Sequence, residues 1–268
     1  MQQFMPPRLG LLDPNSARTI RKRSDKAMSS DTITLFDIPT KSPQVCWSMN
    51  IWRTRLLLNF KGLNYKTEWL EYPQIKERLS QHVSPNEQDP EFTLPAIQMP
   101  DGTYLMDSYR IADYIEGKYP EPSMSLNHPM QLRLRASMVK FMTQMTPIYV
   151  PGVAKNILGD KSIDFFLSTR QEDVGMPLCE YEEKNSPGAL DRAEPFAREI
   201  TELLKENSSG PYFLGDTVSY TDFIWAGILL FFQCLGEKEY QEVLQTTGEA
   251  DVHTKFLEGL ADWTKRNN

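Results

Sequence analysis

The sequence predicts two domains of different class, a small α/β domain followed by a domain made only of helices. Strand-like and helix-like patterns alternate between residues 31 and 122. From about residue 127 to residue 268 helical spacing recurs, and no segment has a convincing strand pattern. The 268 residues are 40% hydrophobic and 11% aromatic, which is enough apolar material for two packed cores.

Residues 1–30 are set apart from this pattern by their charge. They hold six basic and two acidic residues and so carry +4; the net charge of −7 then leaves −11 for the rest of the chain. We interpret them as a disordered basic tail. The alternative is a mitochondrial-type presequence, and Met28 would suit as the start of a shorter product. The acidic body argues against nucleic acid as a partner.

The first domain begins with a strand in TITLFDI, from Thr32. A helix is expected over residues 51–61, because its apolar residues follow helical spacing and Gly62 ends it. YKTEWLEY, residues 65–72, reads as a second strand. Pro73 then opens a short helix, PQIKERLSQHV, since proline suits the first turn of a helix.

A hairpin and a third helix complete this domain. LPAIQM and TYLMD flank Pro100-Asp101-Gly102, a turn signal between two strands. SYRIADYIEGKY then shows a helical apolar stripe, which Pro120 stops. The resulting order, βαβαββα, is thioredoxin-like in outline.

The second domain, residues 127–268, contains several helical segments. The most apolar of them, FIWAGILLFF at residues 223–232, is far shorter than the roughly 18–20 residues of a membrane span, so we expect a buried core helix. Ser219 and Asp222 are spaced as a capping box that starts this helix. The other helical segments are HPMQLRLRASMVKFMTQM, KSIDFFLS, ALDRAEPFAREITELLKEN and TKFLEGLADWTKR.

The cysteines and histidines exclude several kinds of site. The chain has three cysteines and three histidines, all widely separated. An odd number of scattered cysteines suits reduced thiols in the cytosol, and none of the spacings is that of a metal site. No phosphate-binding glycine loop and no local hydrolase motif occurs.

A polar cluster, CWSMN at residues 46–50, lies directly before the first helix. It has two explanations. Ser48 or Asn50 could simply cap the helix by accepting hydrogen bonds from its first amides. Alternatively the cluster carries chemistry, because a hydroxyl or thiol at a helix N-terminus lies where the dipole and free amides favour an anion.

Four motifs in order resemble those of glutathione transferases: SMNIWRTRLLLNFKG, LPAI, DSYRIADYIEGKYP and FLGDTVSYTDF. The resemblance runs from about Thr32 to the C-terminus. WRTRLLLNFKGLNYKTEWLEYP and STRQEDVGMPL further resemble fungal members related to bacterial lignin etherases. The resemblance implies the glutathione transferase fold, glutathione as co-substrate, no metal, a homodimer and a cytoplasmic enzyme.

The resemblance also implies a glutathione site. Leu94 and the cis-proline Pro95 would pair their backbone with the cysteinyl part of glutathione, as when a peptide adds to a strand edge. Asp107 would face the ammonium group of the γ-glutamyl end. Ser108 and the amides at the helix start would bind its carboxylate.

By the same resemblance, Ser48 is the candidate catalytic residue. Serine-type and cysteine-type transferases place the active residue five positions before a basic-x-Arg pattern, here Arg53-Thr54-Arg55. Ser48 would donate a hydrogen bond to the glutathione thiolate. Cys46, which would instead allow chemistry through mixed disulfides, and Asn50 are the alternatives.

The electrophile pocket implied by the family lies between the active-site loop and the first helices of the second domain. Its expected lining is apolar and rich in methionine, which favours a hydrophobic or aromatic ligand. The expected reaction is conjugation, ether cleavage or isomerisation, in detoxification or secondary metabolism. A non-catalytic protein that binds glutathione or an apolar ligand is the alternative. The lining residues are Trp47, Met49, Ile51, Met142, Met145, Tyr149 and Val150.

Overall fold

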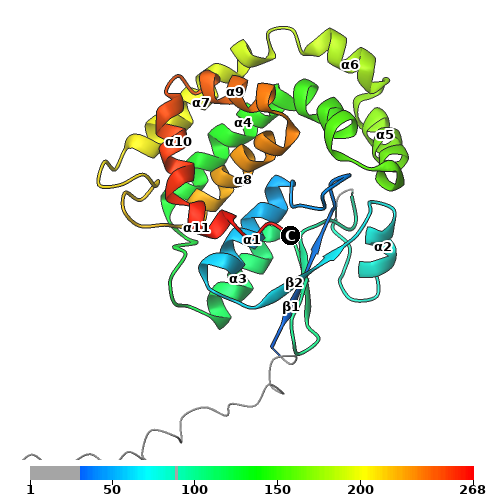
Figure 1. Cartoon of the computed structure of the whole chain (residues 1–268), viewed down its shortest axis with the longest axis vertical. Helices are drawn as coiled ribbons and strands as arrows, with labels where there is room; N and C mark the ends of the chain where they lie inside the picture. Colours follow the sequence, from blue (N-terminus) through cyan, green and yellow to red (C-terminus); the bar gives the residue numbers. More distant parts are fainter. Residues whose placement is uncertain (1–30, 88–89) are drawn as a thin grey trace, which may run out of the picture. The chain divides into compact units, whose positions relative to one another are not determined.

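The N-terminal half contains one mixed four-stranded sheet. The structure, a computed structural model, describes residues 31–87 and 90–268, so the predicted basic tail lies outside the described residues. The strands have the order β2-β1-β3-β4; β1 pairs with β2 in parallel, and the other two pairs are antiparallel (Figure 1). They are β1 (Ile33–Asp37), β2 (Tyr65–Trp69), β3 (Ala96–Gln98) and β4 (Tyr104–Met106).

Three helices alternate with these strands: α1 (Met49–Phe60), α2 (Gln74–Leu79) and α3 (Ser108–Lys118). The order βαβαββα predicted from the sequence is therefore confirmed. Residues 51–58 of α1 are all buried. Helix α1 has no solvent-exposed stripe there because it packs against both helix α3 and helix α8 (Tyr220–Leu235) of the second domain.

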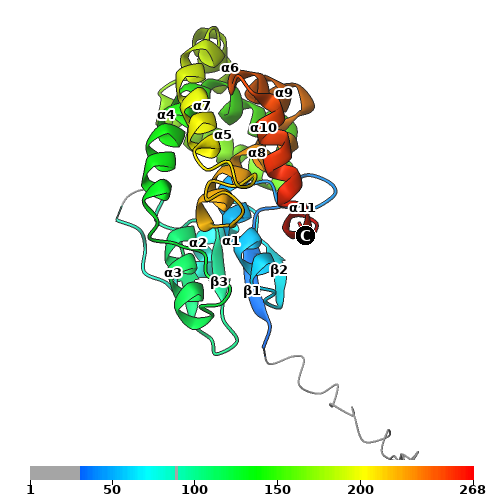
Figure 2. The ribbon, with the colours of Figure 1, turned by 90° about the vertical axis from the view of Figure 1, so that its left-hand side faces the viewer.

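The second domain is helical, as predicted; after β4 the described residues form only isolated β-bridges, at residues 212–217. Figure 2 shows its helices stacked above the sheet domain. The segment predicted as helical at residues 254–266 forms parts of two short helices that meet at Leu260. The elements are α4 (Pro129–Gly152), the π-helix η2 (Val153–Ile157), α5 (Asp160–Val174), α6 (Leu178–Asn185), α7 (Ala189–Lys205), α8 (Tyr220–Leu235), α9 (Glu237–Thr246), α10 (Ala250–Gly259) and α11 (Ala261–Thr264).

Helix α8 is the central core helix, as its composition predicts. Its start carries a capping box formed by Ser219 and Asp222. The Ser219 backbone N–H donates to the Asp222 carboxylate at 2.7 Å, and the Phe213 N–H donates to the other oxygen at 2.9 Å. The buried carboxylate thus fixes both the helix start and the preceding turn. Within the described residues, no helix combines the length and apolarity needed to cross a bilayer.

A buried histidine ties α10 to the core. The Trp225 indole N–H donates to His253 Nδ1 at 3.0 Å, so Nε2 carries the proton and donates to the Thr201 hydroxyl at 2.9 Å. That hydroxyl in turn donates to the Thr247 carbonyl at 2.9 Å. Burial lowers the pKa of His253 to about 4. The imidazole is therefore neutral near pH 7 and completes a chain of hydrogen bonds.

We expect His253→Gln to cost about 1–3 kcal/mol of unfolding free energy at pH 7.5, because buried polar partners lose their bonds. The cost should shrink by about 2 kcal/mol at pH 5. The sign follows from the lowered pKa: below pH 6.5 the unfolded chain binds a proton that the folded parent does not, so the parent loses stability on acidification. Denaturant unfolding of both proteins at both pH values measures the difference.

Asp222 does not disturb this comparison. Burial raises the pKa of its carboxyl to about 6, so its protonation stabilises the folded state on acidification. Parent and variant share this effect, and it cancels in their difference. A cost of His253→Gln that is the same at pH 7.5 and pH 5 would contradict the neutral buried imidazole.

Candidate active site

The topology of the sheet brings three predicted site segments to one edge. β1 and β4 run in the same direction and both are antiparallel to β3. Phe36 near the end of β1, Ala96 at the start of β3 and Met106 at the end of β4 form one row across the sheet. The segments that lead into α1, into β3 and into α3 therefore all lie at this edge, and with them Ser48, Pro95 and Asp107.

Ser48 is the N-cap residue of α1, and its side chain is half-buried. Its carbonyl accepts the first helical hydrogen bond, from Trp52 N–H at 2.9 Å, but its hydroxyl does not cap the helix. No acidic residue lies in the first turn. The hydroxyl and the free amides of a 12-residue helix are thus open to an anion. Asn50, two residues after Ser48, is exposed.

Cys46 lies in a different environment. It is 3% exposed. Burial, followed by the nearby Asp37 carboxylate, raises the pKa of its thiol well above the ordinary value. A reactive cysteine needs the opposite, namely an accessible thiolate stabilised by positive charge. This environment argues against Cys46 as the attacking group.

The two halves of the predicted glutathione site are joined by a hydrogen bond. The Leu94–Pro95 peptide is cis, as the resemblance implies. The Asp107 backbone N–H donates to the Pro95 carbonyl at 3.2 Å. Within the described residues the backbone N–H and C=O of Leu94 take part in no hydrogen bond. Leu94 can therefore pair with an extended ligand beside Asp107.

Asp107 has a strained backbone with φ of 83°. Its Oδ1 caps α3, accepting from Tyr109 N–H at 2.9 Å and from Arg110 N–H at 3.1 Å. A non-glycine residue at positive φ costs about 1–3 kcal/mol, and such residues cluster at ligand clamps. Ser108 next to it is buried, and its carbonyl accepts from the Tyr220 hydroxyl at 2.9 Å. Tyr220 of α8 thus fixes the start of α3.

The predicted hydrophobic lining divides into residues that are buried and residues that are partly exposed. Trp47 and Tyr149 both contact Phe231 of α8, with ring centroids 6.1 Å and 5.7 Å from it. Ile51 and Met145 are 0% and 1% exposed and belong to the core, and their helices α1 and α4 both pack against α8. Val150, Met142 and Trp47 are also buried, whereas Met49 and Tyr149 are half-exposed.

Glycine allows α8 to reach the start of α1. A Cβ added to Gly227 would lie 2.5 Å from the Met49 carbonyl oxygen, which is closer than atoms can approach. The residue after Ser48 is therefore packed directly on the backbone of α8. In the described residues no group of three or more His, Cys, Asp and Glu side chains could hold a metal.

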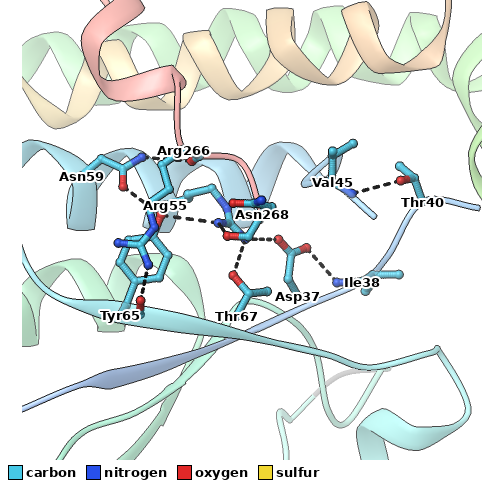
Figure 3. Close-up of polar contacts among 10 residues, drawn as sticks. All are labelled: Asp37, Ile38, Thr40, Val45, Arg55, Asn59, Tyr65, Thr67, Arg266 and Asn268. Atoms are coloured by element: carbon cyan, nitrogen blue, oxygen red, sulfur yellow. Dashed lines mark hydrogen bonds and ion pairs between the residues drawn. The ribbon is translucent and has the colours of Figure 1, made fainter. Parts of the chain in front are cut away.

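Sequence reasoning missed a buried ion pair beneath this loop. Arg55 Nη2 lies 2.7 Å from Asp37 Oδ2, and both side chains are fully buried. The same guanidinium donates to the Thr67 hydroxyl at 3.1 Å (Figure 3). The signal was present, since an arginine directly followed by three leucines lies inside an apolar helix. In the motif pattern, however, Arg55 indicates only the register of Ser48.

Comparison with known families decides the classification. A family model described as "Glutathione S-transferase, N-terminal domain" matches residues 47–118, and one described as "Glutathione S-transferase, C-terminal domain" matches residues 134–263. The chain belongs to the glutathione S-transferase family. A curated relative, the glutathione S-transferase-like protein ustS of Aspergillus flavus, is 28% identical over 230 residues, 78% of this chain and 83% of that protein.

Solved transferase structures from two other organisms have the same fold. A transferase of Phanerochaete chrysosporium is 28% identical, with a TM-score of 0.77. The alignment covers 87% of this transferase and 97% of the Phanerochaete chain. One of Ceriporiopsis subvermispora, solved in complex with glutathione, is 28% identical with a TM-score of 0.73. It covers 88% of this transferase and 97% of its own chain. The predicted two-domain architecture is confirmed.

Proposed function

We propose that this transferase activates the thiol of glutathione through Ser48 and directs it at a hydrophobic, aromatic electrophile. The observation that carries the proposal is the uncommitted Ser48 hydroxyl at the uncapped start of α1. A glutathione thiol has a free pKa of about 8.5. Lowering it by roughly two units takes about 2.7 kcal/mol, which one charge-assisted hydrogen bond and a helix N-terminus can supply.

Glutathione would bind along the sheet edge beside Ser48. Leu94 would pair its free backbone groups with the cysteinyl part, and Asp107 would meet the ammonium of the γ-glutamyl end through Oδ2, since Oδ1 is occupied by the helix cap. Ser108 would hold the carboxylate through its hydroxyl and its backbone N–H, because the amides of Tyr109 and Arg110 already donate to Asp107 Oδ1. The related transferase of Ceriporiopsis subvermispora, solved with glutathione, supports this ligand.

Asp107→Ala should weaken glutathione binding at least about tenfold, or about 1.4 kcal/mol, because the ligand's ammonium loses its carboxylate. The matched control is Asp107→Asn, which keeps an oxygen to cap α3 and tolerates positive φ but carries no charge. Calorimetry should find the asparagine variant weakened as well but as stable as the parent. Parent-like affinity in both variants would remove Asp107 from the site.

The acceptor site would lie where Met49 and Tyr149 reach the surface next to Trp47. Aromatic and thioether side chains favour bulky aromatic ligands and tolerate variation in their shape. We therefore expect aryl ethers, quinones and other aromatic electrophiles to react ahead of small aliphatic acids. Labelled glutathione incubated with a panel of both kinds tests this. Reaction of the aliphatic acids alone would exclude the aromatic acceptor, and glutathione binding without any turnover would favour a ligand-binding protein.

We also propose a homodimer, in which the exposed face of α4 contacts a second copy. Leu132 and Val139, seven residues apart on α4, are 69% and 57% exposed. Two large apolar side chains on one helix face are typical of an association surface. Light scattering should give the mass of a dimer for the parent and of a monomer for the Leu132→Arg, Val139→Arg double variant. A monomeric parent would contradict the proposal.

For location we propose the cytosol. All three cysteines are free in the structure, which suits a reducing compartment. A fluorescent fusion of the full chain should distribute through the cytosol. Accumulation in mitochondria would instead support the presequence interpretation of residues 1–30.

A further inference from the structure

The C-terminal segment, residues 263–268, lies against α1. Asn59 Nδ2 donates to the carbonyls of Trp263 at 2.6 Å and of Arg266 at 3.2 Å. The Trp263 ring packs edge-on against Phe60, with centroids 5.1 Å apart. The segment therefore crosses from the helical domain to the first helix of the sheet domain.

Two arginines extend this contact toward the sheet. The guanidinium of Arg266 lies 3.7 Å from the centre of the Tyr65 ring on β2 and also donates to the Tyr65 carbonyl. Arg55 of α1 donates to the backbone oxygen of Asn268 at 2.9 Å. Figure 3 shows Arg266 lying on Tyr65 and Asn268 beside the Asp37–Arg55 pair, both between α1 and the strands.

The segment also binds the loop that carries Ser48. The Cys46 backbone N–H donates to the Asn267 carbonyl at 2.7 Å. Among the described residues this is the one backbone hydrogen bond that joins residues 46–48 to a segment outside α1. At the other end of the same loop, Lys41 N–H donates to the Ile157 carbonyl of η2 at 2.8 Å. The helical domain thus holds the loop at both ends.

We propose that residues 263–268 are a positioning element that fixes the backbone before Ser48, so that its hydroxyl faces the glutathione thiolate. The proposal rests on the function proposed for Ser48. A donor stabilises a developing charge only when it is already oriented, and small displacements of it cost rate rather than binding. The glutathione-binding residues lie after β2, at the starts of β3 and α3, and are not contacted by this segment in any described interaction.

Two variants release the segment in different ways. Deletion of residues 265–268 removes the bonds to Cys46 and Arg55. Asn59→Asp keeps the acceptor for the Tyr65 hydroxyl, which donates to Oδ1 at 2.8 Å, but sets a carboxylate against two carbonyl oxygens. The control is Lys265→Ala, which removes only an exposed ion pair with Asp262 in the same segment.

Hydrogen exchange measured on the full-length protein reads the contact without turnover. In both releasing variants the Cys46 amide should exchange at least about tenfold faster than in the parent. Its hydrogen bond to the Asn267 carbonyl no longer has to break before the amide can exchange. The pKa of the bound glutathione thiol should rise, so that kcat falls about three- to tenfold at pH 6.5 and recovers at high pH while KM for glutathione stays within about twofold. Lys265→Ala should match the parent in every measurement.

Unchanged exchange at Cys46 in both releasing variants would overturn the proposal. So would faster exchange that leaves the thiol pKa and kcat at parent values, because the contact would then be only structural. Failure of the proposed function has a different signature. It would appear in the parent itself, as no stabilised thiolate on bound glutathione, while the exchange difference at Cys46 persisted.

Discussion

Replacing Ser48 by alanine is expected to lower kcat by about one to three orders of magnitude while glutathione affinity changes little, the range for losing one preorganised donor to a developing anion. The hydroxyl is half-buried at the N-cap of α1 and makes no capping bond. Its removal therefore costs the helix little. The loss should fall on the thiolate, whose stabilisation is the hydroxyl's proposed task.

The pH dependence of kcat should change in a defined direction. In the parent the bound thiol is ionised at lower pH than free glutathione, so kcat rises through that lowered pKa. In the alanine variant the pKa moves up by as much as about two units, and the rise in kcat moves to higher pH with it. Stopped-flow absorbance of the thiolate and a pH–rate profile measure both effects.

Cys46→Ser is the matched control for Ser48→Ala. The serine hydroxyl is close in size to the thiol and can still donate to Asp37, so the variant should retain most of the parent's activity. An inactive Cys46→Ser protein together with an active Ser48→Ala protein would reverse the assignment. It would show that the buried thiol becomes accessible during turnover.

Replacing Arg55 by methionine is expected to lower the free energy of unfolding by about 3–5 kcal/mol, because it leaves the Asp37 carboxylate buried without a cation. Both side chains are fully buried and 2.7 Å apart. The guanidinium also bonds Thr67 and the backbone oxygen of Asn268. Loss of the Arg55 guanidinium therefore removes the contacts that join the sheet, α1 and the C-terminal segment. Denaturant unfolding monitored by tryptophan fluorescence measures the change.

A double variant separates the ion pair from simple packing. Asp37→Leu combined with Arg55→Met replaces both charges by apolar groups, which is often neutral compared with an intact buried pair. The double variant should be more stable than Arg55→Met alone. A loss below about 1 kcal/mol for the single variant would mean that Asp37 is protonated or reached by water once Arg55 is gone.

Local patterns predicted the elements well because their causes are local. The Pro100-Asp101-Gly102 turn, the capping box of Ser219 and Asp222 and the apolar run of α8 each depend on residues close in sequence. The same holds for the placing of Ser48 and Asp107 at helix starts. The sequence could not predict which residues of the expected pocket lining are exposed. Ile51, Met145 and Tyr149 all follow helical spacing and differ only in what packs over them.

By itself the sequence determined the order of strands and helices, the two domains and, through four motifs, the family whose chemistry the chain uses. Only the tertiary structure decided that the Ser48 hydroxyl makes no capping bond, and that Cys46 is buried. It also decided that the Asn267 carbonyl holds the backbone of the loop that leads to Ser48. That bond joins residues more than 200 positions apart and uses a backbone carbonyl, which every residue type possesses. No pattern of side chains can record such a contact, so it appears only when the chain is folded.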